Sequence, residues 1–160
     1  MVELIFVIVI LGVLAAVALP KLAANRNDAK ATRLKATISQ TAMSVTSLYT
    51  SSKIASFTKA MTVPWGSAGD RGVFVLSNND CVATYLESPG NQVVMDIQNN
   101  GVTTPITCDG SVENLETNLS VLITFTFSST NGIVAQVASM SNKASGDTIR
   151  IPLSGREIAR

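Results

Sequence analysis

Residues 1–20 read MVELIFVIVILGVLAAVALP, an apolar run that contains one charged residue, Glu3, and ends at Pro20. No polar side chain interrupts residues 4–19, so this stretch has no face suited to water and is predicted to lie in lipid or among other helices. Its sixteen residues reach about 24 Å as a helix, which is short of the roughly 30 Å core of a bilayer. A carboxylate inside such a segment costs about 2.5 to 3.5 kcal/mol at mid-bilayer, which indicates that Glu3 has a partner.

The helix is predicted to continue to about Ser52, because apolar residues recur at three- and four-residue spacing. These residues are Leu34, Ile38, Ala42, Val45 and Leu48/Tyr49. One long helix thus has an apolar half, residues 1–20, and an amphipathic half, residues 21–52, suited to packing on a sheet. Gly12 and Pro20 both weaken a helix, so the stretch between them is predicted to be a weak point. An ordinary kinked membrane helix is the alternative interpretation.

A basic cluster follows the apolar run and is opposed only by Asp28. Its members are Lys21, Arg26, Lys30, Arg33 and Lys35. The cluster can form a solvated helix face, or it can contact anionic lipid headgroups or acidic residues of a neighbouring subunit. Nucleic-acid binding is not expected, since the net charge of the chain is only +1. A cleaved secretory signal peptide is the plain alternative for the apolar run, but such peptides begin with a positive region.

The composition argues against an enzyme. Histidine is absent, which removes His-based triads, the usual zinc sites and the commonest general base near neutral pH. No Gly-rich phosphate loop of the GxxxxGK type occurs. We therefore expect neither catalysis nor a cofactor.

After Ser52 the pattern changes to short β-rich runs separated by turn residues. Residues 53–71 are predicted to form a loop with a short helix at Ile54–Met61, and residues 72–160 an antiparallel sheet domain. Asn131-Gly132 is predicted to be the turn of a hairpin. The predicted strands are Gly72–Leu76, Val82–Leu86, Gln92–Ile97, Leu119–Phe127, Gly132–Ala138 and Thr148–Leu153. The expected fold class is α+β, with a long N-terminal helix packed by its amphipathic half on an antiparallel sheet.

The first 35 residues resemble the N-terminus of type IV pilins and of the related pseudopilins of type II secretion. Mature chains of that family begin with phenylalanine and continue Thr-Leu/Met-Ile/Val-Glu-Leu, which Met1 to Leu4 match, and Gly12 and Pro20 stand at the expected separations from Glu3. The resemblance implies a pilin-like fold and places Glu3 fifth in the mature chain. We therefore expect two residues, Phe-Thr, and a short basic leader upstream of Met1.

This resemblance also implies a pathway of processing and assembly. A prepilin peptidase would cut and methylate the chain, which would wait in the inner membrane until an assembly platform draws it into a homo-polymer or a co-polymer with other pilins. Glu3 would pair with the N-terminal amine of an adjacent subunit, and residues Gly12 to Pro20 could lose helical order in the fibre. The final location would be an extracellular pilus or a periplasmic pseudopilus. A surface pilus subunit, a secretion pseudopilin and a membrane-anchored periplasmic domain that never polymerises all stay open.

Three further features concern a disulfide, a glycosylation site and a metal site. Cys81 and Cys108 are an even pair in a chain expected to face an oxidising compartment, which favours a disulfide over two separate buried thiols. Asn118-Leu119-Ser120 is a glycosylation sequon with Glu116 two residues earlier, although a chance match is the simpler interpretation. No metal site is expected, because the candidate calcium ligands lack a recognised spacing or enough charge. Those candidates are Asp109, Glu113 and Glu116, and, in a later loop, Asn142, Ser145 and Asp147.

Overall fold

The computed structural model describes residues 2–52, 54–61, 63–77, 80–99, 108, 121–129 and 131–153. Along the chain the elements are α1 (Val2–Ser52), α2 (Phe57–Ala60), β1 (Phe74–Leu76), β2 (Val82–Ser88), β3 (Asn91–Asn99), β4 (Val121–Ser128), α3 (Gly132–Met140) and β5 (Thr148–Pro152). The predicted α+β class, the long N-terminal helix and the antiparallel sheet are confirmed.

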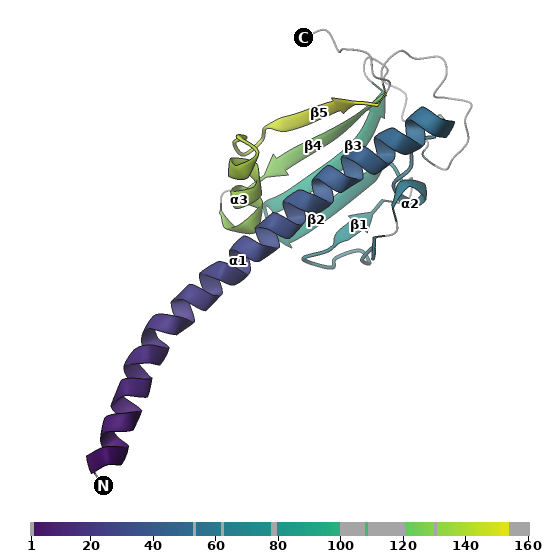
Figure 1. The fold of residues 1–160 in the computed structure, drawn as a ribbon. Helices are drawn as coiled ribbons and strands as arrows, with labels where there is room; N and C mark the ends of the chain where they lie inside the picture. The colour runs from purple at the N-terminus through teal and green to yellow at the C-terminus, as the bar shows by residue number, and fades with distance from the viewer. Residues whose placement is uncertain are drawn as a thin grey trace.

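Helix α1 has two environments, as its sequence predicts. All the side chains described between Val2 and Lys30 are exposed, and Figure 1 shows this part of the helix projecting away from the rest of the molecule. From Ala31 onward one face is buried, at three- and four-residue intervals. The buried residues are Ala31, Leu34, Ile38, Thr41, Ala42, Val45 and Tyr49. Residues 31–52 therefore belong to the globular body, whereas the apolar half and the first ten residues of the amphipathic half do not.

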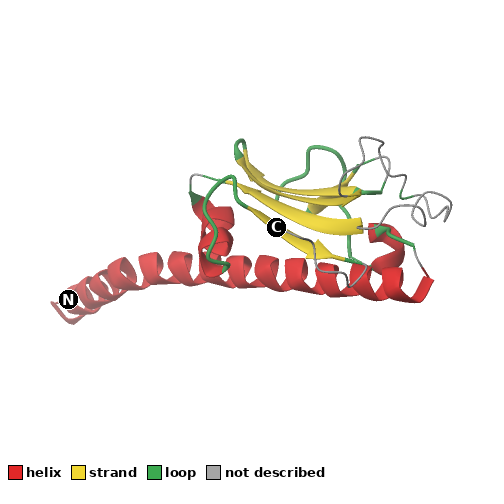
Figure 2. Ribbon diagram, turned by 90° about the horizontal axis from the view of Figure 1, so that it is seen from above, coloured by secondary structure: helices red, strands yellow, loops and turns green. Residues whose placement is uncertain are grey.

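The five strands form one antiparallel sheet in the order β1-β2-β3-β4-β5. Alternate residues of β3 and β4 face each other across the sheet, with Val93 opposite Phe127 and Met95 opposite Phe125, all of them fully buried. Figure 2 shows α1 running along one face of this sheet. The core lies between them, because the apolar stripe of α1 and the inward residues of the strands can leave water only by packing together.

The prediction of a strand over Gly132–Ala138 is wrong, and so is the hairpin that Asn131-Gly132 was expected to turn. These residues form α3, and β4 pairs instead with β3 and β5. Ile133, Val134, Val137 and Ala138 are buried at helical spacing, and a short apolar run of this kind fits helix and strand equally well. Contacts with distant residues decide between the two.

The other boundaries differ by a few residues. The helix expected at Ile54–Met61 is the single turn α2, the strand expected from Gly72 begins at Phe74, and the strand expected at Thr148–Leu153 is β5. Residues 119 and 120, where the strand leading to Phe127 was expected to begin, lie outside the described residues.

Candidate membrane and assembly segment

The projecting half of α1 presents a large apolar surface that no other described part of the chain covers. Between Val2 and Leu22 lie fourteen large apolar side chains, each at least 44 % exposed. Soluble monomers rarely expose patches of more than a few hundred Å². At about 1.5 to 3 kcal/mol for each fully buried side chain, covering the exposed part of this surface would gain on the order of 20 kcal/mol. The segment is therefore built to be covered by lipid or protein.

Among the described residues, α1 is the one helix whose length and composition would allow it to span a membrane. The core helix of a soluble protein can pass the same test, but such a helix is mostly buried. In α1 the most apolar stretch has no buried residue. A membrane or a bundle of similar helices is thus the environment that its chemistry fits.

Glu3 is the only charged residue among residues 2–20 and is exposed on this apolar surface. Within the described part of the chain its side chain makes no hydrogen bond and no ion pair. A carboxylate that enters an apolar phase needs a cation or several donors to offset its lost hydration. The described residues supply none, so a group that pairs with Glu3 would have to come from outside them.

Gly12 and Pro20 both lie within continuous helix. A Cβ at Gly12 would meet no neighbouring group within 4 Å, so no contact inside the subunit requires glycine there. Pro20 has no N–H to donate to the carbonyl one turn earlier, and this half of α1 curves away from the axis of the buried half (Figure 1). The loss of helical order expected between these two residues concerns the fibre and stays a prediction.

Most of the basic cluster is exposed, so the choice between a solvated face and contacts with lipid or a neighbouring subunit stays open. Lys21, Arg26, Lys30 and Arg33 are exposed. Lys35 differs, because it is half-buried and its Nζ donates to the carbonyl oxygen of Met140 at 2.7 Å, where α3 ends. A cation at a helix C-terminus also complements the negative end of the helix dipole. Lys35 therefore helps to dock α3 on α1.

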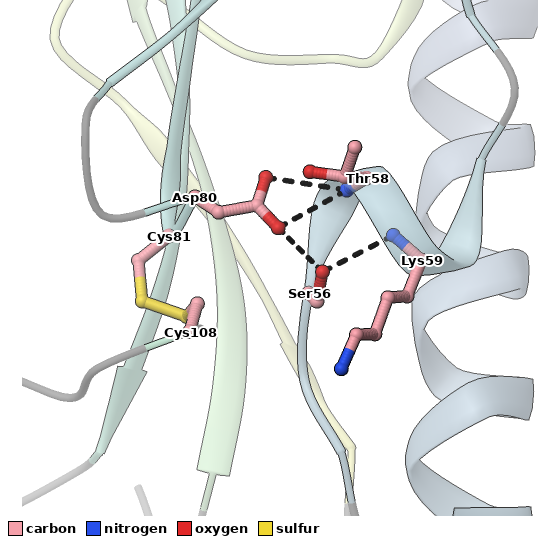
Figure 3. Close-up of a disulfide and its surroundings, with 6 residues drawn as sticks. All are labelled: Ser56, Thr58, Lys59, Asp80, Cys81 and Cys108. Carbon is pink, nitrogen blue, oxygen red and sulfur yellow. Dashed lines mark hydrogen bonds between the residues drawn. A yellow bond between two sulfur atoms is a disulfide. The ribbon is translucent and has the colours of Figure 1, made fainter. Parts of the chain in front are cut away.

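The predicted disulfide between Cys81 and Cys108 is confirmed, with 5.2 Å between the two Cα atoms (Figure 3). Both cysteines are buried. Next to the bridge, the Asp80 carboxylate accepts hydrogen bonds from the Ser56 hydroxyl and from the backbone N–H of Thr58 (Figure 3). The Ser56 hydroxyl in turn accepts from the N–H of Lys59 at 3.1 Å. These contacts tie α2 to the sheet beside the disulfide.

A second carboxylate holds α3. Glu87, at the end of β2, accepts from the N–H groups of Ile133 and Val134 at 2.9 and 3.1 Å, which would otherwise be unpaired at the start of the helix. Sequence reasoning missed both Asp80 and Glu87, because each caps a helix far away in the chain. A local signal existed only for α2, where Ser56 stands directly before the helix as a typical N-cap residue.

Four of the candidate glycosylation and metal-binding residues lie outside the described residues, and two others use their side chains in local hydrogen bonds. Asn118, Asp109, Glu113 and Glu116 lie outside the described residues. In the later loop, Asp147 accepts from the N–H of Ala144 and Ser145 accepts from the N–H of Ser129, so both side chains shape the turn. The described part of the chain contains no cluster of three or more His, Cys, Asp or Glu residues able to hold a metal ion.

Comparison of the chain with protein-family models, with characterised proteins and with solved structures finds no match.

Proposed function

We propose that this protein is the structural subunit of a type IV pilus-like filament, assembled from the inner membrane after processing by a prepilin peptidase. The observation that carries the proposal is Glu3, a lone carboxylate that has no partner among the described residues and stands on an apolar helix that the body does not cover. A simple membrane anchor would have no use for that charge, since it only raises the cost of insertion.

Filament assembly gives both features a physical role. In the membrane, lipid covers the apolar half of α1 and the subunit is held as a monomer. In the fibre, the apolar halves of several subunits cover one another, so the hydrophobic surface stays buried as the subunit leaves the membrane. Glu3 then pairs with the N-terminal amine of a neighbour, and because an unpaired buried charge is costly, this pairing sets the axial register.

The arrangement of the body is consistent with this role. Only the second half of α1 packs on the sheet, so the body and the apolar segment occupy opposite ends of one helix (Figures 1 and 2). A long helix with a sheet on its C-terminal half is the layout expected of a pilin. A bundle of the projecting segments would then carry the bodies on its outside.

Mass spectrometry of the mature N-terminus, on protein taken from native membranes, is the first test. We expect an N-methylated chain beginning Phe-Thr-Met-Val-Glu. A start at Met1 without processing, or cleavage after the apolar run near Ala24, would contradict the proposal.

The role of Glu3 has its own test in cells. Glu3→Ala and Glu3→Leu should abolish or strongly reduce fibres while the subunit still accumulates in the membrane. Asp28→Ala is the matched control, because it removes an exposed carboxylate from the same helix outside the apolar run and loses only one long hydrogen bond, from Nε2 of Gln136 at 3.4 Å. Normal fibres from both Glu3 variants would refute the pairing. Deletion that strands exoproteins in the periplasm, with no surface fibres in the wild type, would assign the subunit to a secretion pseudopilus instead.

A further inference from the structure

A hollow of about 280 Å³ lies at the point where α1 leaves the globular body, between α1, the segment before β1, and the edge of the sheet. Its wall combines cations with apolar and aromatic side chains. The lining residues that the argument uses are Lys30, Arg33, Phe74 and Tyr85, with Val63 and Pro64 on the side of the connecting segment. The hollow has the size of a small ligand and shares no residue with the apolar half of α1.

Two cations line this hollow without a charged partner. Lys30 and Arg33 are three residues apart on α1, which places them on the same face of the helix. Neither side chain makes an ion pair or hydrogen bond within the described part of the chain. Glu87, whose charge raises the pKa of nearby Tyr85, already accepts hydrogen bonds from the N–H groups of α3. The positive charge in the hollow is therefore available to a ligand.

Tyr85 adds a hydroxyl group to the lining of the hollow beside these cations. The residue is only 8 % exposed, and its ring packs at a tilt of 54° against the ring of Phe74, with 5.4 Å between the ring centroids. Its hydroxyl has no hydrogen-bond partner within the described residues. Burial, together with the charge of Glu87, raises the pKa of Tyr85 above 10.0, so the hydroxyl keeps its proton at neutral pH.

We propose that this hollow binds a small phosphate ester that carries an apolar group. Arg33 suits a phosphate because a guanidinium donates two parallel hydrogen bonds, Lys30 adds a point charge, and Tyr85 adds a hydroxyl donor. The apolar group packs against Phe74, Val63 and Pro64. Inorganic phosphate would use only the polar half of the site and therefore binds more weakly. The inference is independent of filament assembly.

Such an ester can come from two sources. Lys30 lies eight residues beyond Leu22, the last large apolar residue of the projecting segment, or about 12 Å along the helix. A phospholipid headgroup at the surface of the membrane would lie about this far from the apolar segment. A soluble phosphate ester presents the same chemistry. The experiment is designed to separate them.

The probe is phenyl phosphate, added to the full-length chain in phosphatidylcholine nanodiscs. Trp65 is the only tryptophan and follows Val63 and Pro64 directly, so its fluorescence should report binding. We expect saturable binding, at least tenfold tighter than that of inorganic phosphate. Replacing phosphatidylcholine by phosphatidylglycerol weakens the apparent affinity for phenyl phosphate if the headgroup occupies the site, and leaves it unchanged if the natural ligand is soluble.

Variants decide whether the hollow is the site. Lys30→Gln with Arg33→Gln should weaken binding at least tenfold, and Tyr85→Phe about threefold to tenfold. The matched control, Lys21→Gln with Arg26→Gln, removes the same charge from exposed positions of the same helix outside the hollow and should change binding less than twofold. Circular dichroism confirms that each variant folds. No saturable binding at millimolar phenyl phosphate, or equal losses in the two double variants, would overturn the proposal.

Discussion

The contact between Glu87 and α3 gives a stability prediction whose size can be worked from the structure. Glu87→Ala removes both acceptors from the N–H groups of Ile133 and Val134. A hydrogen bond to a charged group contributes about 1.5 to 3 kcal/mol, and loss of a helix cap costs about 0.5 to 2 kcal/mol. Because Glu87 is only half-buried and water can replace part of the contact, we expect a loss of about 2 kcal/mol in the free energy of unfolding.

Gly132, the first residue of α3, is coupled to the same contact. Its φ is +79°, and a Cβ added there would lie 2.7 Å from Oε1 of Glu87. Gly132→Ala therefore has two costs, about 1 to 2 kcal/mol for a left-handed backbone and a further cost for the clash with the carboxylate. In the Glu87→Ala background the clash disappears and only the backbone cost is left. The double variant should thus be more stable than the sum of the two single losses predicts, by about 1 kcal/mol.

Thermal unfolding of the full chain in detergent micelles, followed by near-ultraviolet circular dichroism, measures these effects. For a body of this size a loss of 2 kcal/mol lowers Tm by about 6 to 10 °C. Hydrogen exchange at the amides of Ile133 and Val134 should accelerate in Glu87→Ala before that of the sheet. Glu3→Ala is the matched control, since it makes the same substitution at an exposed site outside the body and should leave Tm within about 2 °C. An equal Tm for Glu87→Ala and Glu3→Ala, or strict additivity with Gly132→Ala, would refute the capping role.

Other parts of the molecule give further expectations. Reducing the Cys81–Cys108 bridge, which separates its cysteines by 27 residues, should cost about 3.5 kcal/mol in the chain-entropy model, measured by unfolding with and without reductant. Asp80→Asn should speed hydrogen exchange at Thr58, whose N–H loses its charged acceptor, and unchanged exchange would contradict the link. Burial raises the pKa of Tyr49, and burial with Glu87 raises that of Tyr85, so the phenolate absorbance of the native chain should titrate above pH 10.0 and return to about 10.0 in denaturant. Burial also raises the pKa of Asp96 above 3.8, although a hydrogen bond from Gln98 acts in the opposite direction. The contribution of Asp96 to stability is therefore present below pH 3.8 and is lost as the pH rises through the native pKa. Asp96→Asn should accordingly stabilise the fold more at pH 7 than at pH 3, and an equal effect at both would contradict the assignment.

The length of α1 and its division into an apolar and an amphipathic half were predictable, because both depend on the local pattern of apolar residues. An uninterrupted apolar run and a repeat of three and four residues each determine which side of a helix can face water. Leu34, Ile38, Ala42, Val45 and Tyr49, the stripe expected to pack on the sheet, are all buried there. The strands β2 and β3 were similarly predictable, since polar turn residues separate two runs rich in β-branched and other apolar side chains.

Helix α3 was not predictable, because what selects it lies elsewhere in the chain. Asn131-Gly132 is a common hairpin turn, and the apolar residues that follow suit a strand. The carboxylate that caps the helix belongs to Glu87, 46 residues before Ile133, and Lys35 meets the other end of α3 from 105 residues before Met140. The hollow beside Tyr85 escaped prediction for the same reason, since α1 and β2 meet there only after the sheet has formed.

Only one half of α1 takes part in the core of the body. The stripe from Ala31 to Tyr49 is buried in the core of the body, whereas no residue from Val2 to Leu22 contributes to it. Substitutions in the projecting half should therefore cost the body little stability, and under the proposed function they would act on contacts with lipid or with other subunits. The two halves are joined by continuous helix without a loop, although Pro20 removes one backbone hydrogen bond between them, so the helix limits where each body stands relative to its apolar segment. If the segments of many subunits pack in register, the bodies must then repeat at the same spacing, and a regular outer surface follows from the packing at the centre.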